Sequence, residues 1–558
     1  MKSKWQEYRS SLIPITITAF LAHGFLLIAS GTWWDDWVYA DKNWEYMLDV
    51  CKQSSLPLHA YINGFLWLLP DGFYRIITFF LFLGDALLLY YILKKIPAFE
   101  AEDALWIAIL FSVIPINDAR ITWICFGYSL GLFLFLLSFS IGVLWKTFPD
   151  KGPRRVIFRL VSLLLLLISY DTESNMAMTP LILFFFYYMD LRDHWKESCC
   201  GHRCRQFLIS VLKHADYLLA PFVWYFADKM LFPGYGVYSG HSYVVAASLP
   251  DIIKRSFLLS GESLKGLLHN YSYMAGKMGL TAVLLCLIVL IAITNKKSQP
   301  KAENKPAVNK CLGMILLGCT AFYFGVFPYL VKRGQAVESV LILGRDSLLL
   351  GIGTAIIIYY TVKLLANFRV KRGILLLIVV LGIAHFNYYY MTWQECYYQQ
   401  LQLRSEIENN EHIIDNDTFL VMFSNDVVST HFYQINGNSW RATGTQNRFY
   451  MSGINDIQYL IDMDENSWIL NAYCMRDYDY KDKTIDGIIF VDYHPAGSKV
   501  ILKEKAYELF KKEEFEKWID TAADIKYVPL SETDSDYIVD LFKEGNLTRD
   551  MLYNSYSK

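Results

Sequence analysis

The sequence predicts an α-helical, multi-pass membrane protein with a water-facing α/β domain at its C-terminal end. Of the 558 residues, 54% are hydrophobic and 19% are charged, and the mean hydropathy is +0.25. A soluble globular chain is usually about a quarter charged. Long apolar runs fill residues 1–393, whereas residues 394–558 are polar and rich in Asp, Asn, Lys and Tyr. We therefore predict two domains, a transmembrane domain over 1–393 and a second domain over 394–558.

About eleven segments are apolar enough to cross a bilayer. A helix needs about 20 apolar residues to cross the roughly 30 Å hydrocarbon layer, with its backbone bonded internally. Eight runs are clear candidates: Leu12–Gly31, Tyr74–Leu93, Ile121–Trp145, Leu208–Leu231, Leu280–Thr294, Leu312–Leu330, Val340–Thr361 and Gly373–Trp393. Three shorter runs are plausible spans: Leu105–Ile116, Val156–Tyr170 and Met176–Met189. The first run follows a basic segment and lacks a small-residue cleavage site, so we interpret it as a retained helix.

The Lys and Arg residues of the loops predict the orientation. One alternating set of loops is rich in them: Lys2, Lys4, Arg9, Lys94, Lys95, Lys146, Lys151, Arg154, Arg155, Arg192, Lys196, Arg203, Arg205, Lys296, Lys297, Lys301, Lys305, Lys310, Lys363, Arg369, Lys371 and Arg372. The other set is longer in total but carries few. Basic loops stay in the cytoplasm. We predict a plasma (inner) membrane protein with a cytoplasmic N-terminus and, after an odd number of crossings, an extracytoplasmic tail.

Local patterns complete the predicted organisation. Tyr61–Leu69 is predicted to lie in the membrane interface or to dip into it. Two amphipathic pieces suit the membrane surface, Ile252–Leu259 and Leu264–Leu268. The tail alternates strand-like and helical runs, which predicts a small α/β domain with its own core. The strand-like runs are Thr418–Phe423, Gly487–Val491 and Lys499–Leu502, and the helical ones are Asn455–Met463 and Lys503–Thr521.

Charge and cysteine usage narrow the function classes. The net charge of −2 and the lack of a basic cluster interleaved with aromatic residues argue against a nucleic-acid partner. The ten cysteines form no disulfide framework. The group Cys199-Cys200-Gly201-His202-Arg203-Cys204 could supply zinc ligands, but its spacing matches no common zinc motif. A basic juxtamembrane loop with free thiols is the favoured interpretation.

Two adjacent carboxylates directly follow the first predicted span, in Thr32-Trp33-Trp34-Asp35-Asp36-Trp37. Adjacent carboxylates repel, so one can be held protonated or poised as a base. The tryptophans also fit an interfacial belt, and the acids also fit a solvated loop. Residue chemistry alone favours neither interpretation.

The position of this pair resembles the GT-C glycosyltransferases, which carry acids in the first outer loop of a chain with about eleven spans. The Trp-Asp-Asp-Trp setting more narrowly resembles the bacterial GtrII-type glucosyltransferase family. The resemblance covers residues 1–393 in topology. It implies a GT-C-like fold and transfer of a hexose, with glucose expected, from a polyprenyl-phosphate carrier to an extracytoplasmic glycan or surface polymer. It also implies that Asp35 or Asp36 is the general base or positions the acceptor, and that the anomeric centre inverts.

Such a donor needs cations on the outer side, to hold its phosphate and to stabilise the leaving charge. Lys332 and Arg333 follow one predicted span. Arg345 is expected about five residues, or roughly 8 Å, into the next helix, where it needs a cavity or a partner. Pairing with Asp346 is the alternative. Arg120 lies in a tight outer turn, and anchoring of the short helix pair is slightly favoured over phosphate binding.

Asp171 and Glu173 lie in another short outer turn, Tyr170–Asn175. They could order the acceptor's hydroxyl groups, or bind a divalent cation together with Asp35 and Asp36. A solvated turn is favoured, and no spacing rule enforces a metal, so no cofactor is assigned.

Asp85 and His23 lie roughly 14–17 Å above the cytoplasmic boundary on sequential spans. Intramembrane carboxylates are rarely unpaired, so we predict a hydrogen-bonded structural pair and favour it over a proton relay. The relay interpretation belongs to the rival function, a transporter or lipid-linked glycan flippase. No internal repeat and no matching pair of broken spans supports that rival. A non-catalytic assembly protein that binds through its tail is a third alternative.

Overall fold

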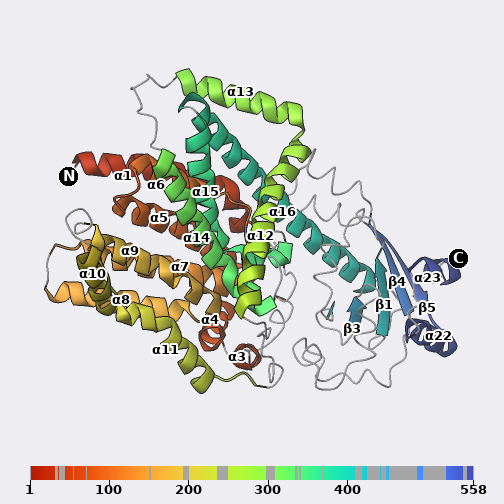
Figure 1. The fold of residues 1–558 in the computed structure, drawn as a ribbon. Coiled ribbons are helices and arrows are strands. Elements are labelled where there is room, and N and C mark those ends of the chain that lie inside the picture. Colours follow the sequence, from red (N-terminus) through yellow and green to blue (C-terminus); the bar gives the residue numbers. More distant parts are fainter. Residues whose placement is uncertain are drawn as a thin grey trace.

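The computed structural model is mostly helical (Figure 1). It describes residues 2–29, 31, 36, 44–53, 56–70, 72–149, 152–192, 200–235, 249–296, 308–333, 337, 341–366, 368–408, 418–423, 440–441, 448–451, 487–493, 523–543 and 549–556. Asp35, Cys199 and the predicted runs Asn455–Met463, Lys499–Leu502 and Lys503–Thr521 lie outside the described residues.

Described helices overlap each of the predicted apolar runs, while α3, α4 and α12 lie between those runs. The first half contains α1 (Lys2–His23), α3 (Trp44–Gln53), α4 (Pro57–Trp67), α5 (Phe73–Lys95), α6 (Ala101–Phe111), α7 (Phe126–Thr147), α8 (Pro153–Ser169), α9 (Thr179–Leu191), α10 (Cys200–Lys213) and α11 (Ala215–Leu231). The second half contains α12 (Leu249–Met278), α13 (Leu280–Lys296), α14 (Val308–Arg333), α15 (Leu350–Leu365) and α16 (Phe368–Glu408). Short 3₁₀ helices join several of them: η1 (Gly24–Leu27), η3 (Asp118–Ile121), η4 (Glu173–Met178) and η6 (Leu341–Ser347).

Within the described residues, four helices are long and apolar enough to cross a membrane. They are α5, α7, Val308–Tyr329 of α14 and Val370–Met391 of α16. The number rises to six if each of two bent pairs counts as one span: α10 with α11, bent by 49°, and α12 with α13, bent by 102°. The count of eleven therefore stays a prediction.

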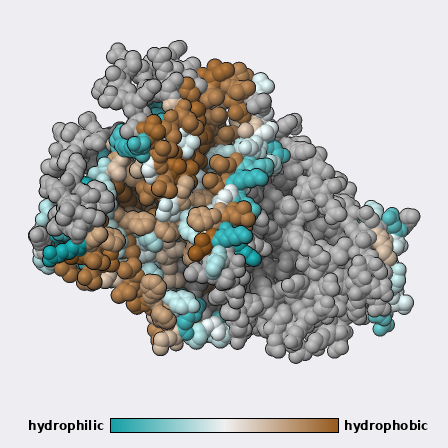
Figure 2. Space-filling view, viewed as in Figure 1, coloured by the Kyte–Doolittle hydropathy of each residue, from teal (hydrophilic) through white to brown (hydrophobic). Residues whose placement is uncertain are grey.

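Apolar side chains cover a broad area of the bundle's outer face, as the brown surface of Figure 2 shows. Exposed apolar residues recur along single helices: Val156, Ile157, Leu160 and Leu164 on α8, Leu219, Phe222, Phe226 and Met230 on α11, and Leu284, Leu285 and Ile288 on α13. Water disfavours contiguous apolar patches of this kind, whereas lipid tails accept them. This surface is consistent with insertion into a membrane.

Neighbouring helices pack closely where glycine removes the side chain. A Cβ on Gly353 of α15 would overlap the backbone of Phe322 on α14 and lie 2.7 Å from the carbonyl oxygen of Gly318. A Cβ on Gly382 of α16 would overlap the carbonyl oxygen of Val113. The buried apolar core draws residues from these helices and also from α1, α5, α6, α7 and α9.

The bundle has two distinct ends. At one end of the bundle, α5 and α15 finish and α6 and α14 begin. We call this the basic end. Here Lys363 Nζ lies 2.7 Å from Asp103 Oδ1, and Lys310 Nζ lies 2.8 Å from Glu100 Oε1. We call the other end, where α5 and α7 begin, the opposite end. It contains η3, η4 and η6, and Tyr74 stacks on Trp123 there at 5.8 Å.

The tail contains a five-stranded sheet with strand order β2-β3-β1-β4-β5. The strands are β1 (Thr418–Phe423), β2 (Trp440–Arg441), β3 (Arg448–Met451), β4 (Gly487–Tyr493) and β5 (Ala523–Pro529). β1 runs parallel to β3 and β4, and β5 is antiparallel to β4. The helices α22 (Glu532–Lys543) and α23 (Arg549–Tyr556) follow, and Tyr553 of α23 meets Phe490 of β4 edge-on. Two predicted strands are thus confirmed; a separate α/β domain from residue 394 stays a prediction, and α16 continues through that boundary to Glu408.

Candidate functional site

Asp36 is a buried carboxylate at the opposite end of the bundle, with 2% of its surface exposed. Its Oδ1 accepts the backbone N–H of Ile124 at 2.9 Å. Its Oδ2 lies 3.4 Å from the hydroxyl of Tyr74, which also lies 3.0 Å from the carbonyl oxygen of Ile121. The turn that joins η3 to α7 therefore holds Asp36 in a fixed position, and Asp36 is not a solvated loop residue.

Arg75 lies next to this carboxylate and was missed in the sequence. Its Nη1 donates to the hydroxyl of Tyr74 at 2.9 Å and to the carbonyl oxygen of Gly31 at 2.8 Å, and the residue is 4% exposed. The guanidinium lies over the Tyr74 ring at 4.9 Å. Tyr74 thus links a buried cation to Asp36. A lone arginine inside the predicted span Tyr74–Leu93 was the available signal.

Asp171 is buried, with 5% exposure, and binds the start of α4. It accepts the backbone N–H groups of Leu58 at 3.3 Å and His59 at 2.9 Å, and its Oδ2 lies 2.5 Å from Nδ1 of His59. The N-cap residue Leu56 has no side chain that could satisfy these donors. The favoured expectation of a solvated turn is therefore wrong for Asp171. Glu173 lies in η4, and its side chain is outside the described part.

The first turn of α7 brings these groups together. Asp36 is bonded at Ile124, and the imidazole of His59 packs over Gly127, three residues further on. Thr172, the neighbour of Asp171, donates through Oγ1 to the carbonyl oxygen of Gly127 at 3.3 Å. The segment from Ile124 to Gly127 thus contacts Asp36 directly, and it contacts two neighbours of Asp171, Thr172 and His59.

Arg345 lies in the 3₁₀ helix η6, before α15 begins at Leu350, so the expected position about five residues into the next transmembrane helix is wrong. Its Nε lies 3.6 Å from Asp346 Oδ1, so the alternative pairing is present. Ser347 anchors η6 at the opposite end, since its Oγ accepts the N–H of Asn117 at 2.9 Å and donates to the carbonyl oxygen of Gly344 at 2.6 Å. Its neighbour Arg345 therefore lies at this end too. Lys332 and Arg333 end α14, and their side chains lie outside the described residues.

Arg120 is fully buried and takes the arrangement that the anchoring alternative predicts. It donates through Nε to the carbonyl oxygen of Asn117 at 2.8 Å and through Nη2 to that of Ile116. Its guanidinium also lies over the rings of Phe82 at 3.9 Å and Phe386 at 4.8 Å. These contacts fix η3 between α5 and α16.

The predicted pair of Asp85 and His23 is wrong. His23 Nε2 lies 2.9 Å from the carbonyl oxygen of Ser112, and Nδ1 lies 2.8 Å from the hydroxyl of Tyr390. Both carboxylate oxygens of Asp85 are buried and make no hydrogen bond within the described residues. Its charged neighbour is Arg120, which acts on it electrostatically. Equal depth did not make them partners, because the ring nitrogens of His23 face α6 and α16.

No group of three His, Cys, Asp or Glu side chains in the described part of the chain could hold a metal ion. Asp35 and the side chain of Glu173 are outside that part, so a divalent cation stays an open prediction. Cys204 is a free, exposed cysteine.

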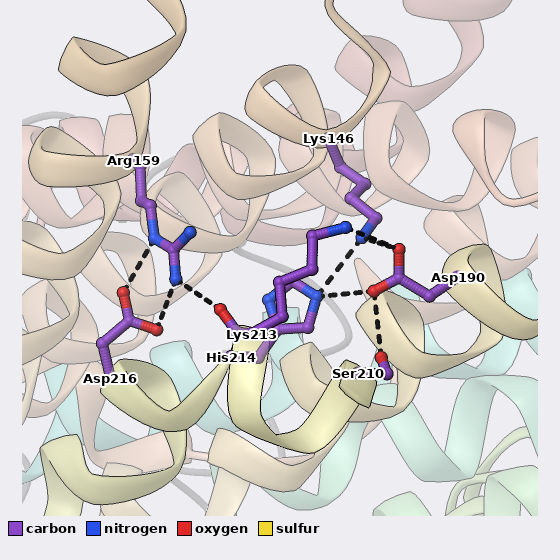
Figure 3. A network of polar contacts seen from close by, with 7 residues as sticks. All are labelled: Lys146, Arg159, Asp190, Ser210, Lys213, His214 and Asp216. Atoms are coloured by element: carbon purple, nitrogen blue, oxygen red, sulfur yellow. Dashed lines mark hydrogen bonds and ion pairs between the residues drawn. The ribbon is translucent and has the colours of Figure 1, made fainter. Parts of the chain in front are cut away.

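A second polar cluster lies at the basic end (Figure 3). Asp190, at the end of α9, accepts from Lys146 at 2.5 Å, Lys213 at 3.0 Å, His214 at 2.8 Å and Ser210 at 2.9 Å. His214 lies at the break between α10 and α11. One carboxylate therefore fixes the ends of α7 and α9 to the bend of the α10–α11 pair.

Neither a scan of protein-family models nor a search of curated proteins found a match to this chain. The candidate site therefore rests on the geometry of its residues.

Proposed function

We propose that the protein is a membrane glycosyltransferase. It moves a hexose, with glucose expected, from a polyprenyl-phosphate carrier in the plasma membrane to an extracytoplasmic glycan or surface polymer. The observation that carries the proposal is the position of Asp36: a buried carboxylate, fixed by backbone, at the end of the bundle away from the Lys- and Arg-rich loops. Donor lipid and surface acceptor meet on that side of a membrane.

The carboxylate of Asp36 is the group that we assign to receive the proton of the acceptor hydroxyl. A carboxylate offers about four lone-pair positions on its two oxygens. Ile124 and Tyr74 each take one. An acceptor hydroxyl that Asp36 activates must lie within about 3 Å of it. Asp35 is the neighbouring candidate for the same role.

The reaction we propose is a direct displacement at the anomeric carbon. Asp36 or Asp35 takes the proton of the acceptor hydroxyl. At the same time, the oxygen of that hydroxyl bonds to C1 of the sugar. The bond between C1 and the phosphate oxygen breaks, and its electron pair leaves with the polyprenyl phosphate. Arg345, with Lys332 and Arg333, would meet the charge on that phosphate. The anomeric configuration inverts.

A transporter or lipid-linked glycan flippase is the second candidate, and Asp85 is the observation that favours it. Its buried carboxylate has no hydrogen-bond partner among the described residues, and such groups often belong to ion pathways. However, His23 is bound to Ser112 and Tyr390 and is not available as a relay partner. The position of Asp36, fixed at the opposite end of the bundle, therefore favours the enzyme over the transporter.

Transfer can be measured directly. The purified protein is incubated with a panel of polyprenyl-phospho-sugars and a glycan acceptor, with and without a chelator of divalent cations. We expect one donor to release polyprenyl phosphate and to yield a glycosylated product. Transport of a lipid-linked sugar across proteoliposomes, without any new glycosidic bond, would instead support the second candidate.

A further inference from the structure

Arg75 connects the chain just before Asp36 to the tyrosine that contacts this carboxylate. Its Nη1 donates to the carbonyl oxygen of Gly31 at 2.8 Å and to the hydroxyl of Tyr74 at 2.9 Å. Gly31 precedes Asp36 by five residues in the sequence. Arg75 is 4% exposed, so these bonds are shielded from water. One nitrogen of a buried guanidinium therefore joins the chain before Asp36 to the start of α5.

Gly72 makes room for the guanidinium of Arg75. This N-cap residue of α5 has a φ of 76°, a conformation that residues with a side chain rarely adopt. A Cβ on Gly72 would also overlap Nη2 of Arg75. The guanidinium lies over the ring of Tyr74 at 4.9 Å, which is a cation–π contact. The glycine thus lets Arg75 fold back over the first turn of α5, and the ring of Tyr74 stabilises it there.

The hydroxyl of Tyr74 transmits the effect of Arg75 to Asp36. A tyrosine hydroxyl donates its one hydrogen and accepts at the same oxygen. Because the oxygen accepts from Arg75, the hydrogen is directed to the carbonyl oxygen of Ile121 at 3.0 Å or to Oδ2 of Asp36 at 3.4 Å. Oδ1 of Asp36 accepts the N–H of Ile124 at 2.9 Å. Loss of Arg75 would therefore remove the donor that orients the hydroxyl next to this carboxylate.

We propose that Arg75 is a positioning residue for glycosyl transfer, which holds Asp36 in place through the hydroxyl of Tyr74 and the carbonyl oxygen of Gly31. This inference rests on the proposed function. Asp36 takes the proton of the acceptor hydroxyl, and Arg75 gives up and receives no atom. A displacement of about 1 Å in a reacting group can lower the rate about 100-fold. Arg75 should therefore act on kcat, whereas a cation that binds the donor phosphate in ground and transition states alike acts on KM.

A role in stability alone is the competing explanation, because loss of a buried hydrogen-bond donor lowers the free energy of unfolding. Arg75→Met removes both hydrogen bonds and leaves a long apolar side chain. Arg75→Lys keeps a charged donor, and Tyr74→Phe removes only the hydroxyl. Arg159→Met is the matched control at the basic end (Figure 3), because Arg159 lies over the ring of Trp145 at 4.7 Å and donates to Asp216 at 2.8 Å.

Hydrogen exchange of backbone N–H groups reports the position of Asp36 without any substrate. The N–H of Ile124 exchanges when its bond to Asp36 opens. The N–H of Ala104 donates to the carbonyl oxygen of Glu100 at 3.0 Å at the basic end, and Ala104 is fully buried. Its exchange therefore reports opening of the bundle away from the site.

The full chain is compared with its variants in lipid nanodiscs. We expect Arg75→Met and Tyr74→Phe to speed exchange at Ile124 at least about tenfold and to change exchange at Ala104 less than about threefold. Arg159→Met should leave exchange at Ile124 unchanged. In steady-state transfer, Arg75→Met should lower kcat about 10–100-fold with the donor KM within about threefold of wild type. Arg75→Lys should restore kcat to within about tenfold of wild type.

Wild-type exchange at Ile124 in Arg75→Met would refute the positioning role, and so would equal acceleration at Ile124 and Ala104. A raised donor KM with an unchanged kcat would also refute it, because Arg75 would then be a phosphate contact. If Arg75→Met does not fold, Tyr74→Phe decides by the same measurements. Wild-type kcat despite faster exchange at Ile124 would refute the positioning role and leave the proposed function standing. Faster exchange at Ile124 alone, with no transfer by the wild-type protein from any donor, would retain Arg75 as the support of Asp36 and refute the proposed function.

Discussion

Replacing Asp36 with Asn removes a proton acceptor and changes little else. The two side chains have nearly the same size. The amide oxygen of Asn can still accept from the N–H of Ile124, now at 2.9 Å from Oδ1. Its NH₂ can donate to the hydroxyl oxygen of Tyr74, whose hydrogen can go to the carbonyl oxygen of Ile121 at 3.0 Å. These two contacts of the carboxylate thus survive in neutral form.

The expected effects on stability and on rate differ enough to be separated. A hydrogen bond to a charged group contributes about 1.5–3 kcal/mol and a neutral one about 0.5–1.5 kcal/mol. Replacing two hydrogen bonds to a charged group with two neutral ones lowers the free energy of unfolding by about 2 kcal/mol. The typical total stability is about 5–15 kcal/mol. More than about 90% of the protein therefore stays folded. Loss of a general base lowers the rate about 10²–10⁴-fold, or about 2.7–5.5 kcal/mol.

Single-turnover transfer from the donor, measured next to melting temperature, distinguishes these effects. We expect at least one of Asp36→Asn and Asp35→Asn to abolish transfer while the protein still inserts and purifies. Asp49→Asn is the control, because Asp49 accepts from Gln53 at 2.6 Å and from Tyr235 at 3.1 Å outside the α7 turn. Wild-type rates in both the Asp35 and the Asp36 variant would refute the assignment of the base.

Four further predictions follow from single features. Arg345→Ala should raise KM for the donor more than it lowers kcat, because the cation meets phosphate in ground and transition states alike; equal KM values would contradict this. Gly353→Ala should destabilise the detergent-solubilised protein by about 1–3 kcal/mol through overpacking, whereas Gly313→Ala, with open space around its Cβ, should not lower the melting temperature. Asp85→Asn should leave transfer within about threefold of wild type, since the carboxylate has no hydrogen bond to lose among the described residues; abolished transfer would give Asp85 a role in the reaction. A reporter active only in the cytoplasm, fused after Lys558, should stay silent, and strong signal would reverse the topology.

Apolar run length was sufficient for the long spans. Tyr74–Leu93 and Leu312–Leu330 lie within α5 and α14, because a helix of this length is the structure that satisfies its own backbone in lipid. Run length did not predict where a helix is interrupted by a contact with a distant residue. Leu208–Leu231 is interrupted at His214, which is held by Asp190 of α9. Hydropathy averaged over neighbours does not detect a single side chain bonded to another helix.

The site could be predicted only where local sequence was informative, because distant contacts leave no local signal. Asp36 could be named from its position after the first span. The partner of Asp171 could not, because His59 lies 112 residues earlier and nothing local connects them. Arg75 was hidden inside an apolar run, although an arginine there requires a partner. Arg345 was assigned to a helix because its flanks are apolar, whereas Ser347 bonds to Asn117 and Gly344 and holds η6 as a 3₁₀ turn.

The distribution of these polar contacts bears on the choice between enzyme and carrier. A carrier has to open at both ends in turn. At the basic end, Asp103 is bound by Tyr359 at 2.6 Å, Tyr360 at 2.8 Å and Lys363 at 2.7 Å, and its side chain is fully buried. Breaking the ion pair of Asp103 and Lys363 and leaving one charge buried costs about 3–5 kcal/mol. Opening at the basic end would therefore have to replace these contacts. An enzyme that works from the opposite end has no need to break them, and there the N–H of Ile124 holds Asp36 and the carboxylate of Asp171 holds His59.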